Sequence, residues 1–139
     1  MATKEEFLPE TMASPENGEK LTRGIRPFKV TYKGEELIVD LPGYYPERGG
    51  EGIHVGRDMA VVDEALRNLK EKIDGVPSPA TIKRVRAKLK LSQRDAGALL
   101  KVGENAFDKY ERGLVEPSGP TSQLIRILDR HPEIAKELR

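Results

Sequence analysis

The sequence LSQRDAGALLKVGENAFDKYERG, residues 91–113, carries the clearest structural pattern of the chain. It predicts two short helices joined by a tight turn, the arrangement of a helix-turn-helix. Ser92 can cap the first helix by accepting from its free amides, and Gly97 is small where two helices must cross closely. The second helix turns its aromatic residues inward and leaves a polar face open. The residues predicted to point inward are Ala96, Leu100, Val102, Phe107 and Tyr110.

That polar face carries the strongest candidates for DNA recognition. Asn105 and Lys109 are four residues apart, so they share one side of a helix. In the major groove asparagine pairs with adenine and lysine with guanine, and each good pair discriminates by about 1 to 3 kcal/mol. We therefore predict that Asn105 and Lys109 read bases.

Four neighbouring residues extend the predicted DNA contact. Gln93 and Arg94 stand at the start of the first helix, where a side-chain amide and a backbone amide can both bind a phosphate. Ala106 is small enough to touch a thymine methyl group. Glu104 can accept from cytosine or satisfy amides at the helix N-terminus, and we favour the second role.

The helices predicted around this motif make residues 76–139 an all-α domain of five helices. One helix begins at Ser78, with Pro79 at its first position. A turn over residues 117–120 and a break at His131 delimit two more helices. The apolar residues of these last two helices exceed the needs of one small core and predict a two-fold dimer interface. They are Leu124, Ile125, Ile127, Leu128, Ile134 and Leu138.

Residues 25–75 predict a small α+β domain. β-favouring residues on either side of Lys33-Gly34 predict a hairpin. A helix capped by Asp58 follows and ends near Gly75. This helix should cover the hairpin, because it carries an apolar stripe. The residues of the stripe are Val62, Leu66, Leu69 and Ile73.

The remaining segments of the first half contain many helix and strand breakers. Residues 1–24 predict an irregular arm. Residues 41–52 predict a loop in which Tyr44 and Tyr45 are partly exposed. Ile53 and Val55 then form a short strand of the same sheet.

Charge is distributed unevenly along the chain. Residues 76–139 hold 13 Lys and Arg against 8 Asp and Glu, a net charge of +5, whereas residues 1–75 hold 11 against 15, a net charge of −4. The basic half therefore predicts a polyanionic partner such as DNA. The acidic half must bind something else.

Composition excludes several classes of protein. The 139 residues include no cysteine, which excludes a disulfide framework and a thiolate zinc site. No stretch approaches the ~20 apolar residues that span a bilayer, so we expect a cytoplasmic protein with no membrane partner. His54 follows glycines that lack the spacing of a phosphate-binding loop. We therefore predict no catalytic residue, no cofactor and no enzyme activity.

Residues 91–113 resemble the helix-turn-helix of the Xre/Cro class of phage repressors. The wider run of residues 78–139 is similar to the C-terminal domain of MqsA-type antitoxins. The residues that carry this resemblance are the Asn105-Ala106-Phe107 and Lys109-Tyr110-Glu111 core and the ending Leu128-Asp129-Arg130-His131-Pro132-Glu133. The resemblance implies a dimer that represses its own operon, with Asn105 and Lys109 at the base-reading positions.

This chain departs from the family in two places. The N-terminal part of the family is a zinc-bound module, held by two cysteine pairs, that masks an mRNA-cleaving toxin. The chain keeps the order of hairpin, loop and helix but has no cysteine, so no metal is predicted. In addition, Lys101 stands where the motif usually has a turn glycine. Either Gly103 absorbs the strain of the turn or Lys101 reaches a phosphate.

The function predicted from the sequence is that of a dimeric repressor on a palindromic double-stranded operator, acting as the antitoxin of a type II toxin-antitoxin pair. The acidic first half and its exposed hairpin edge would neutralise a small mRNA-cleaving toxin. The alternative is a stand-alone Xre-type regulator whose N-terminal domain senses a protein or a ligand. In that case the segment around Tyr44 and Tyr45 is the candidate ligand site.

Overall fold

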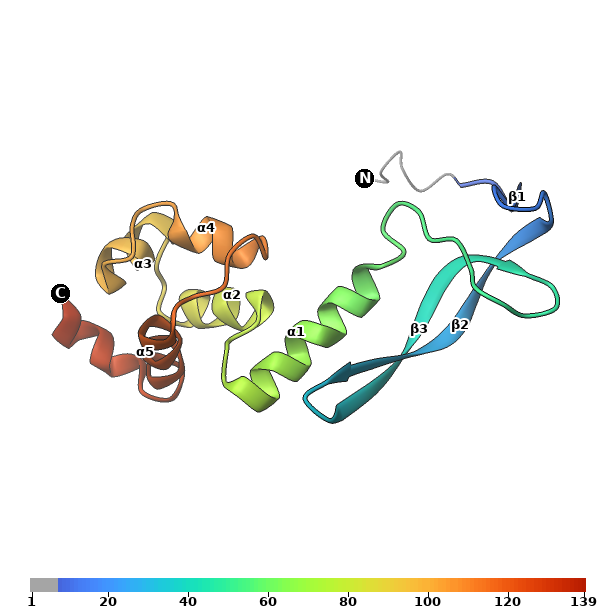
Figure 1. Ribbon diagram of the computed structural model, residues 1–139. Helices are drawn as coiled ribbons and strands as arrows, with labels where there is room; N and C mark the ends of the chain where they lie inside the picture. The colour runs from blue at the N-terminus through green and yellow to red at the C-terminus, as the bar shows by residue number, and fades with distance from the viewer. Residues whose placement is uncertain (1–7) are drawn as a thin grey trace. The chain divides into compact units, whose positions relative to one another are not determined.

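The computed structural model describes residues 8–139. The chain divides into two compact units, residues 1–69 and 70–139 (Figure 1). Three antiparallel strands and most of helix α1 (Ala60–Asp74) belong to the first unit, and four further helices with a final 3-10 helix belong to the second. The predicted combination of an α+β part and an all-α part is confirmed.

The first unit is built on one long, twisted hairpin (Figure 1). Strand β2 (Lys20–Tyr32) pairs with β3 (Glu35–Pro46) along its whole length, and the short β1 (Thr11–Ala13) pairs with the start of β2. Lys33 and Gly34 close the hairpin with φ values of 48° and 87°. Two positive φ values in a two-residue loop match the twist of the flanking strands, so the predicted turn is confirmed.

The hairpin is longer than the sequence predicts. The irregular arm over residues 1–24 is wrong for its second half, because β1 and the first residues of β2 lie there; residues 1–7 are outside the described part. The loop predicted over residues 41–52 is wrong for residues 41–46, because β3 continues to Pro46, and is confirmed for residues 47–52. Tyr45 is partly exposed, as predicted. Tyr44 is only 2% exposed and therefore cannot form an open ligand site. In place of the predicted strand at Ile53 and Val55 there is a single bridge between Ile53 and Tyr44.

Breakers are tolerated in β3 because of their positions. A Cβ at Gly43 would lie 2.6 Å from Nδ1 of His54, so the missing side chain makes room for that ring. The backbone N–H of Tyr44 points away from β2 and donates to Ile53 O. Residues two apart in a strand have their backbone nitrogens on the same side, so Pro42 lies where β2 requires no N–H. The strand therefore accommodates Gly43 where a ring packs closely and Pro42 where the backbone nitrogen faces outward.

Helix α1 covers one face of the hairpin. Val30 of β2 is buried against Ala65 and Leu69 of α1. The predicted stripe is confirmed for Val62, Leu66 and Leu69, whereas Ile73 is not part of this core. The residues packed around the three buried ones are Tyr32, Val39, Val62 and Leu66. Asp58 is not the helix cap, because α1 begins at Ala60 and the Asp58 carboxylate accepts from Val55 N and Arg23.

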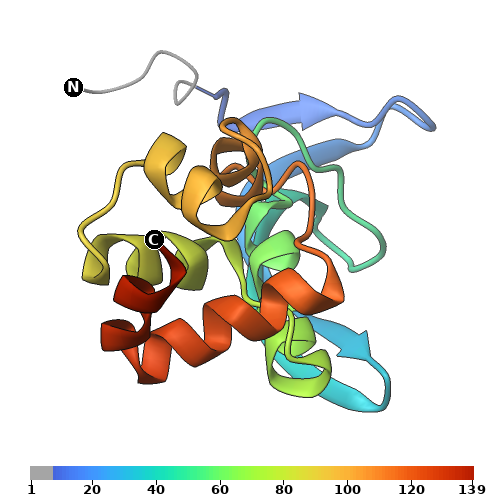
Figure 2. The same ribbon diagram turned by 90° about the vertical axis from the view of Figure 1, so that its left-hand side faces the viewer.

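The second unit contains five helical segments. They are α2 (Pro79–Lys88), α3 (Gln93–Leu100), α4 (Ala106–Glu111), α5 (Gly119–Arg130) and the 3-10 helix η2 (Pro132–Leu138). Helix α2 contacts both α4 and α5, and η2 folds back from α5 to contact α3 (Figure 2). Ser78, Ser92 and Ser118 each accept from the backbone N–H three residues later, which confirms the predicted caps at Ser78 and Ser92.

One core holds these helices together, and Ile82, Ile125 and Leu128 are its most deeply buried large residues, each 1% exposed. Leu124, Ile134 and Leu138 also pack on it. The predicted surplus of apolar residues for a dimer is therefore wrong. Of the six residues named for that interface only Ile127 is exposed, at 46%.

The turn between α3 and α4 is fixed by backbone constraints. Lys101 caps α3 in the left-handed conformation, with φ 60° and ψ 39°, and Val102 N–H donates to Gly97 O at 3.0 Å. This is the hydrogen bond of a Schellman motif, which usually has glycine at the left-handed position. Gly97 leaves room for the turn, because a Cβ there would lie 2.0 Å from the Gly103 carbonyl oxygen.

We predict that Gly97→Ala lowers the free energy of unfolding by about 1 to 3 kcal/mol, because the new methyl group must push backbone rather than a flexible side chain. Urea denaturation followed by circular dichroism at 222 nm measures this change. Gly119→Ala is the control, since nothing lies within 4 Å of its added Cβ. That variant should be neutral or slightly more stable, and equal stability of the two variants would contradict the packing argument.

Candidate nucleic-acid interface

Helix α4 has one buried side and one exposed side. Phe107 and Tyr110 are 3% and 7% exposed, and their rings meet edge to face with centroids 5.5 Å apart. Burial raises the pKa of Tyr110 above its ordinary value. The two aromatic rings fix the rotation of α4 about its axis, so the remaining side of the helix must face outward.

The predicted base-reading pair lies on that outward side. Asn105 occupies the N-cap position of α4, yet its side chain makes no capping hydrogen bond, and both Asn105 and Lys109 are exposed. Lys101, in the turn before α4, is exposed as well. Within residues 8–139, neither lysine forms an ion pair, so their charges are available to a partner.

The other residues predicted to contact DNA already interact, to different degrees, with neighbouring residues of the second unit. Arg94 Nε lies 3.0 Å from Glu104 Oε1, and both side chains remain largely exposed. Such a surface pair is weak and can open when a phosphate approaches. Ala106 is half-buried and packs on the core, so only part of it faces outward.

Gln93 takes part in a partly buried polar network that the sequence does not reveal. Its Nε2 donates to Glu111 Oε1 at 3.1 Å, and Arg86 binds the same carboxylate through Nε at 2.6 Å and Nη2 at 3.0 Å. Arg86 also donates to Leu91 O at 3.0 Å. The network therefore joins the end of α2, the start of α3 and the end of α4.

The charges of this network stabilise each other. Burial alone acts to raise the pKa of Glu111, but the hydrogen bonds from Arg86 and Gln93 outweigh it, so the pKa lies below its ordinary value. Glu111 and Arg86 are 6% and 18% exposed. Because 25 residues separate them, no local spacing in the sequence points to this pair.

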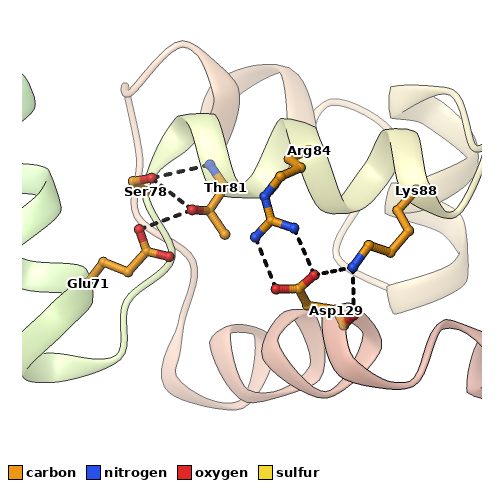
Figure 3. Close-up of polar contacts among 6 residues, drawn as sticks. All are labelled: Glu71, Ser78, Thr81, Arg84, Lys88 and Asp129. Carbon is orange, nitrogen blue, oxygen red and sulfur yellow. Dashed lines mark hydrogen bonds and ion pairs between the residues drawn. The ribbon is translucent and has the colours of Figure 1, made fainter.

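Two of the basic side chains of α2 are neutralised by a carboxylate of α5. Arg84 forms two hydrogen bonds with the carboxylate of Asp129, at 2.9 and 3.0 Å, and Lys88 Nζ lies 2.6 Å from the same carboxylate (Figure 3). These two cations hold the pKa of Asp129 far below its ordinary range. They therefore join α2 to α5 instead of adding to a free basic surface.

The family model described as "Antitoxin component of bacterial toxin-antitoxin system, MqsA" matches residues 12–139. The chain belongs to the MqsA antitoxin family. Antitoxin MqsA of Escherichia coli (strain K12) is 29% identical over 122 residues, which cover 86% of this chain and 93% of that protein. A role in a toxin-antitoxin system, and with it a toxin partner, follows from membership of the MqsA family.

The zinc module that the resemblance implies does not fit this MqsA-family chain. The sequence has no cysteine, and between residues 8 and 139 no three His, Asp or Glu side chains gather closely enough to hold a metal ion. Over the same residues, no helix is long and apolar enough to cross a membrane.

We predict that Glu111→Ala lowers the free energy of unfolding by about 1 to 3 kcal/mol, because it leaves the partly buried guanidinium of Arg86 without its carboxylate partner. Asp108→Ala, which removes an exposed pair with Arg112, is the control and should cost about 0.5 kcal/mol or less. Urea denaturation measures both.

The same comparison has a defined pH dependence. Because the folded protein lowers the pKa of Glu111, its stabilising effect is complete above the unfolded value of about 4.3 and is lost as the pH falls through the folded value. The gap between parent and Glu111→Ala should therefore narrow in acid. A gap that widens below pH 4 would contradict the assigned charge state.

Proposed function

We propose that the second unit is a sequence-specific DNA-binding domain, extending over about residues 76–139, that represses the operon of its own gene. The observation that carries this proposal is the outward side of α4, where Asn105 and Lys109 are exposed. The opposite side of the same helix is anchored by two buried aromatic rings. The α3–turn–α4 arrangement then acts as a helix-turn-helix, with α4 in the major groove.

The conformation of Lys101 supports a phosphate contact in the turn. Its left-handed backbone is one that glycine adopts without cost and that other L-residues adopt at a cost of roughly 1 kcal/mol or more. Gly103, with φ 108°, does not relieve Lys101 of this conformation. A lysine at a strained position is understandable if its charge is needed there.

We propose that two copies bind a palindromic operator. Helix α4 is short, from Ala106 to Glu111, and one such helix reads only a few base pairs. A symmetric dimer would place two of them on half-sites about one turn, ~34 Å, apart. The net charge of +5 over residues 76–139 supports binding to DNA phosphates.

We propose that the first unit neutralises the toxin, a small mRNA-cleaving protein, through the hairpin. Ile25 of β2 and Ile38 of β3 are 64% and 60% exposed. They lie on the same face of the hairpin, because Ile38 pairs with Lys29, which is four residues after Ile25 in the same strand. Apolar side chains this exposed on a sheet are typical of a protein contact.

The hairpin edges are poorer candidates than this face. The backbone N–H of Arg23 points away from β3 and donates to Glu10 O. Every second residue of β2 has its backbone nitrogen on this outer edge, and one of these residues is Pro27, which has no N–H to donate. Pro42 interrupts the outer edge of β3 in the same way. Proline on an edge hinders the addition of another strand. We therefore favour the face over the edge that the sequence suggested.

We expect Asn105→Ala and Lys109→Ala each to weaken binding to the protein's own upstream DNA by about 10-fold or more, since each removes a base contact worth about 1 to 3 kcal/mol. Lys101→Gly should instead weaken binding uniformly and reduce the salt slope by about one, without loss of stability. Fluorescence anisotropy over a range of salt concentrations measures both effects.

Lys136→Ala provides the control for these variants, because this lysine is exposed on η2 rather than on α4. It should bind almost as the parent does. Parent-like binding by Asn105→Ala and Lys109→Ala would show that another face meets DNA. Failure of the parent itself to bind would reject the repressor.

For the toxin, we expect the double variant Ile25→Ser, Ile38→Ser to lose at least tenfold in affinity for the protein encoded by the adjacent gene, measured by calorimetry. The loss follows from the apolar area that the contact no longer buries. Ile127→Ser, an exposed isoleucine of the second unit, is the matched control. Unchanged affinity of the double variant would move the contact elsewhere, and a neighbouring product that does not bind at all would favour the stand-alone regulator.

A further inference from the structure

Two arginines of β2 are each stacked on a tyrosine of β3. The guanidinium of Arg23 lies 4.7 Å from the ring centroid of Tyr44, and that of Arg26 lies 4.4 Å from the centroid of Tyr45. The hairpin register places Arg23 directly opposite Tyr44. Stacking leaves the planar N–H groups of each guanidinium free to donate sideways.

The first arginine holds four segments together. Arg23 donates to both oxygens of Asp58, at 2.9 and 3.0 Å, and Asp58 also accepts from Val55 N at 2.9 Å. The hydroxyl of Tyr44 donates to Pro9 O at 2.7 Å. Asp58 is only 5% exposed. This cluster joins the segment before β1, both hairpin strands and the segment before α1.

The second arginine holds the loop that follows β3. Arg26 donates to Pro46 O at 2.5 Å and to Gly50 O at 3.3 Å. The hydroxyl of Tyr45 donates to Leu41 O at 2.6 Å. Gly52 packs under the Tyr45 ring, since a Cβ there would lie 2.6 Å from it. The loop is thus fixed by carbonyl oxygens that a single cation binds.

We propose that these two arginine–tyrosine clamps replace a bound metal ion in the first unit, so that this part of the antitoxin folds without metal. A structural metal ion ties distant loops through several ligands at once. Among residues 8–139 no set of side chains gathers that could hold such an ion. Two guanidinium groups instead tie separate segments of this unit through carboxylate and carbonyl oxygens. The unit should consequently be insensitive to chelators and to thiol oxidants.

The proposal stands apart from DNA binding and from the identity of the toxin, because it concerns how the first unit is held. Its buried ion pair gives it a specific weak point. Removing one partner of such a pair leaves the other charged and buried. The segments tied by Asp58 should therefore loosen together when it is neutralised.

The test uses the purified full-length chain. Elemental analysis by mass spectrometry should find less than a tenth of an equivalent of zinc or iron. Amide hydrogen exchange of residues 9–13, 21–32 and 41–58 should be the same with and without a chelator. Stoichiometric metal, together with faster exchange of these segments after chelation, would overturn the proposal.

The variants test the clamps themselves. Asp58→Asn should speed exchange in these segments at least tenfold while leaving residues 93–111 unchanged, and Arg26→Lys should speed exchange of residues 46–53 alone. Glu36→Gln is the matched control, because it alters an exposed pair with Lys29 on the same hairpin. If Asp58→Asn does not fold, Arg26→Lys decides the question. Parent-like exchange in Arg26→Lys and in any folded Asp58→Asn would show that the clamps do not hold the unit.

Discussion

The arrangement of the second unit depends on the buried carboxylate of Glu111 and the two side chains that bind it. Arg86 arrives from α2 and Gln93 from α3, while Glu111 itself ends α4. A charged group this deeply buried is stable only with complete hydrogen bonding. These hydrogen bonds favour one arrangement of the three helices, and that arrangement sets the direction of the outward face of α4.

Apolar packing stabilises the second unit, and polar contacts determine how its helices are oriented. The core around Ile82, Ile125 and Leu128 supplies apolar burial, which is not directional. Direction comes from the Arg86 network and from the contact of Gly97 with the Gly103 carbonyl, which fixes how closely α3 and the turn approach. Lys101 retains a strained backbone in that turn. The surface proposed to bind DNA is thus held by specific contacts on its inner side, and its outer side is exposed to solvent.

Arginine performs the same task in the first unit. Lysine presents a single ammonium group, whereas the planar guanidinium can stack on a tyrosine and still donate to two or more oxygens. Arg23 and Arg26 use this property to connect segments that have few apolar residues of their own. The apolar core beneath α1 is small, so such polar ties carry a larger share of the order in this unit.

Features that depend on neighbours along the chain were predictable from the amino-acid pattern alone. Serine caps, the Lys33-Gly34 turn, the apolar stripe of α1 and the inward rings of α4 are local, and each was predictable from residue spacing. The MqsA family motif was equally visible. The length of the hairpin, the burial of Tyr44 and the partners of Asp58 and Glu111 became visible only in the three-dimensional packing. The pairs Arg23–Asp58, Tyr44–Pro9 and Arg86–Glu111 are 25 to 35 positions apart. Glycine and proline predict a loop from local sequence alone, and the packing of His54 beside Gly43 is visible only in three dimensions. Likewise, Leu138 packs on the core because η2 folds back on it, and no local pattern of the sequence predicts this.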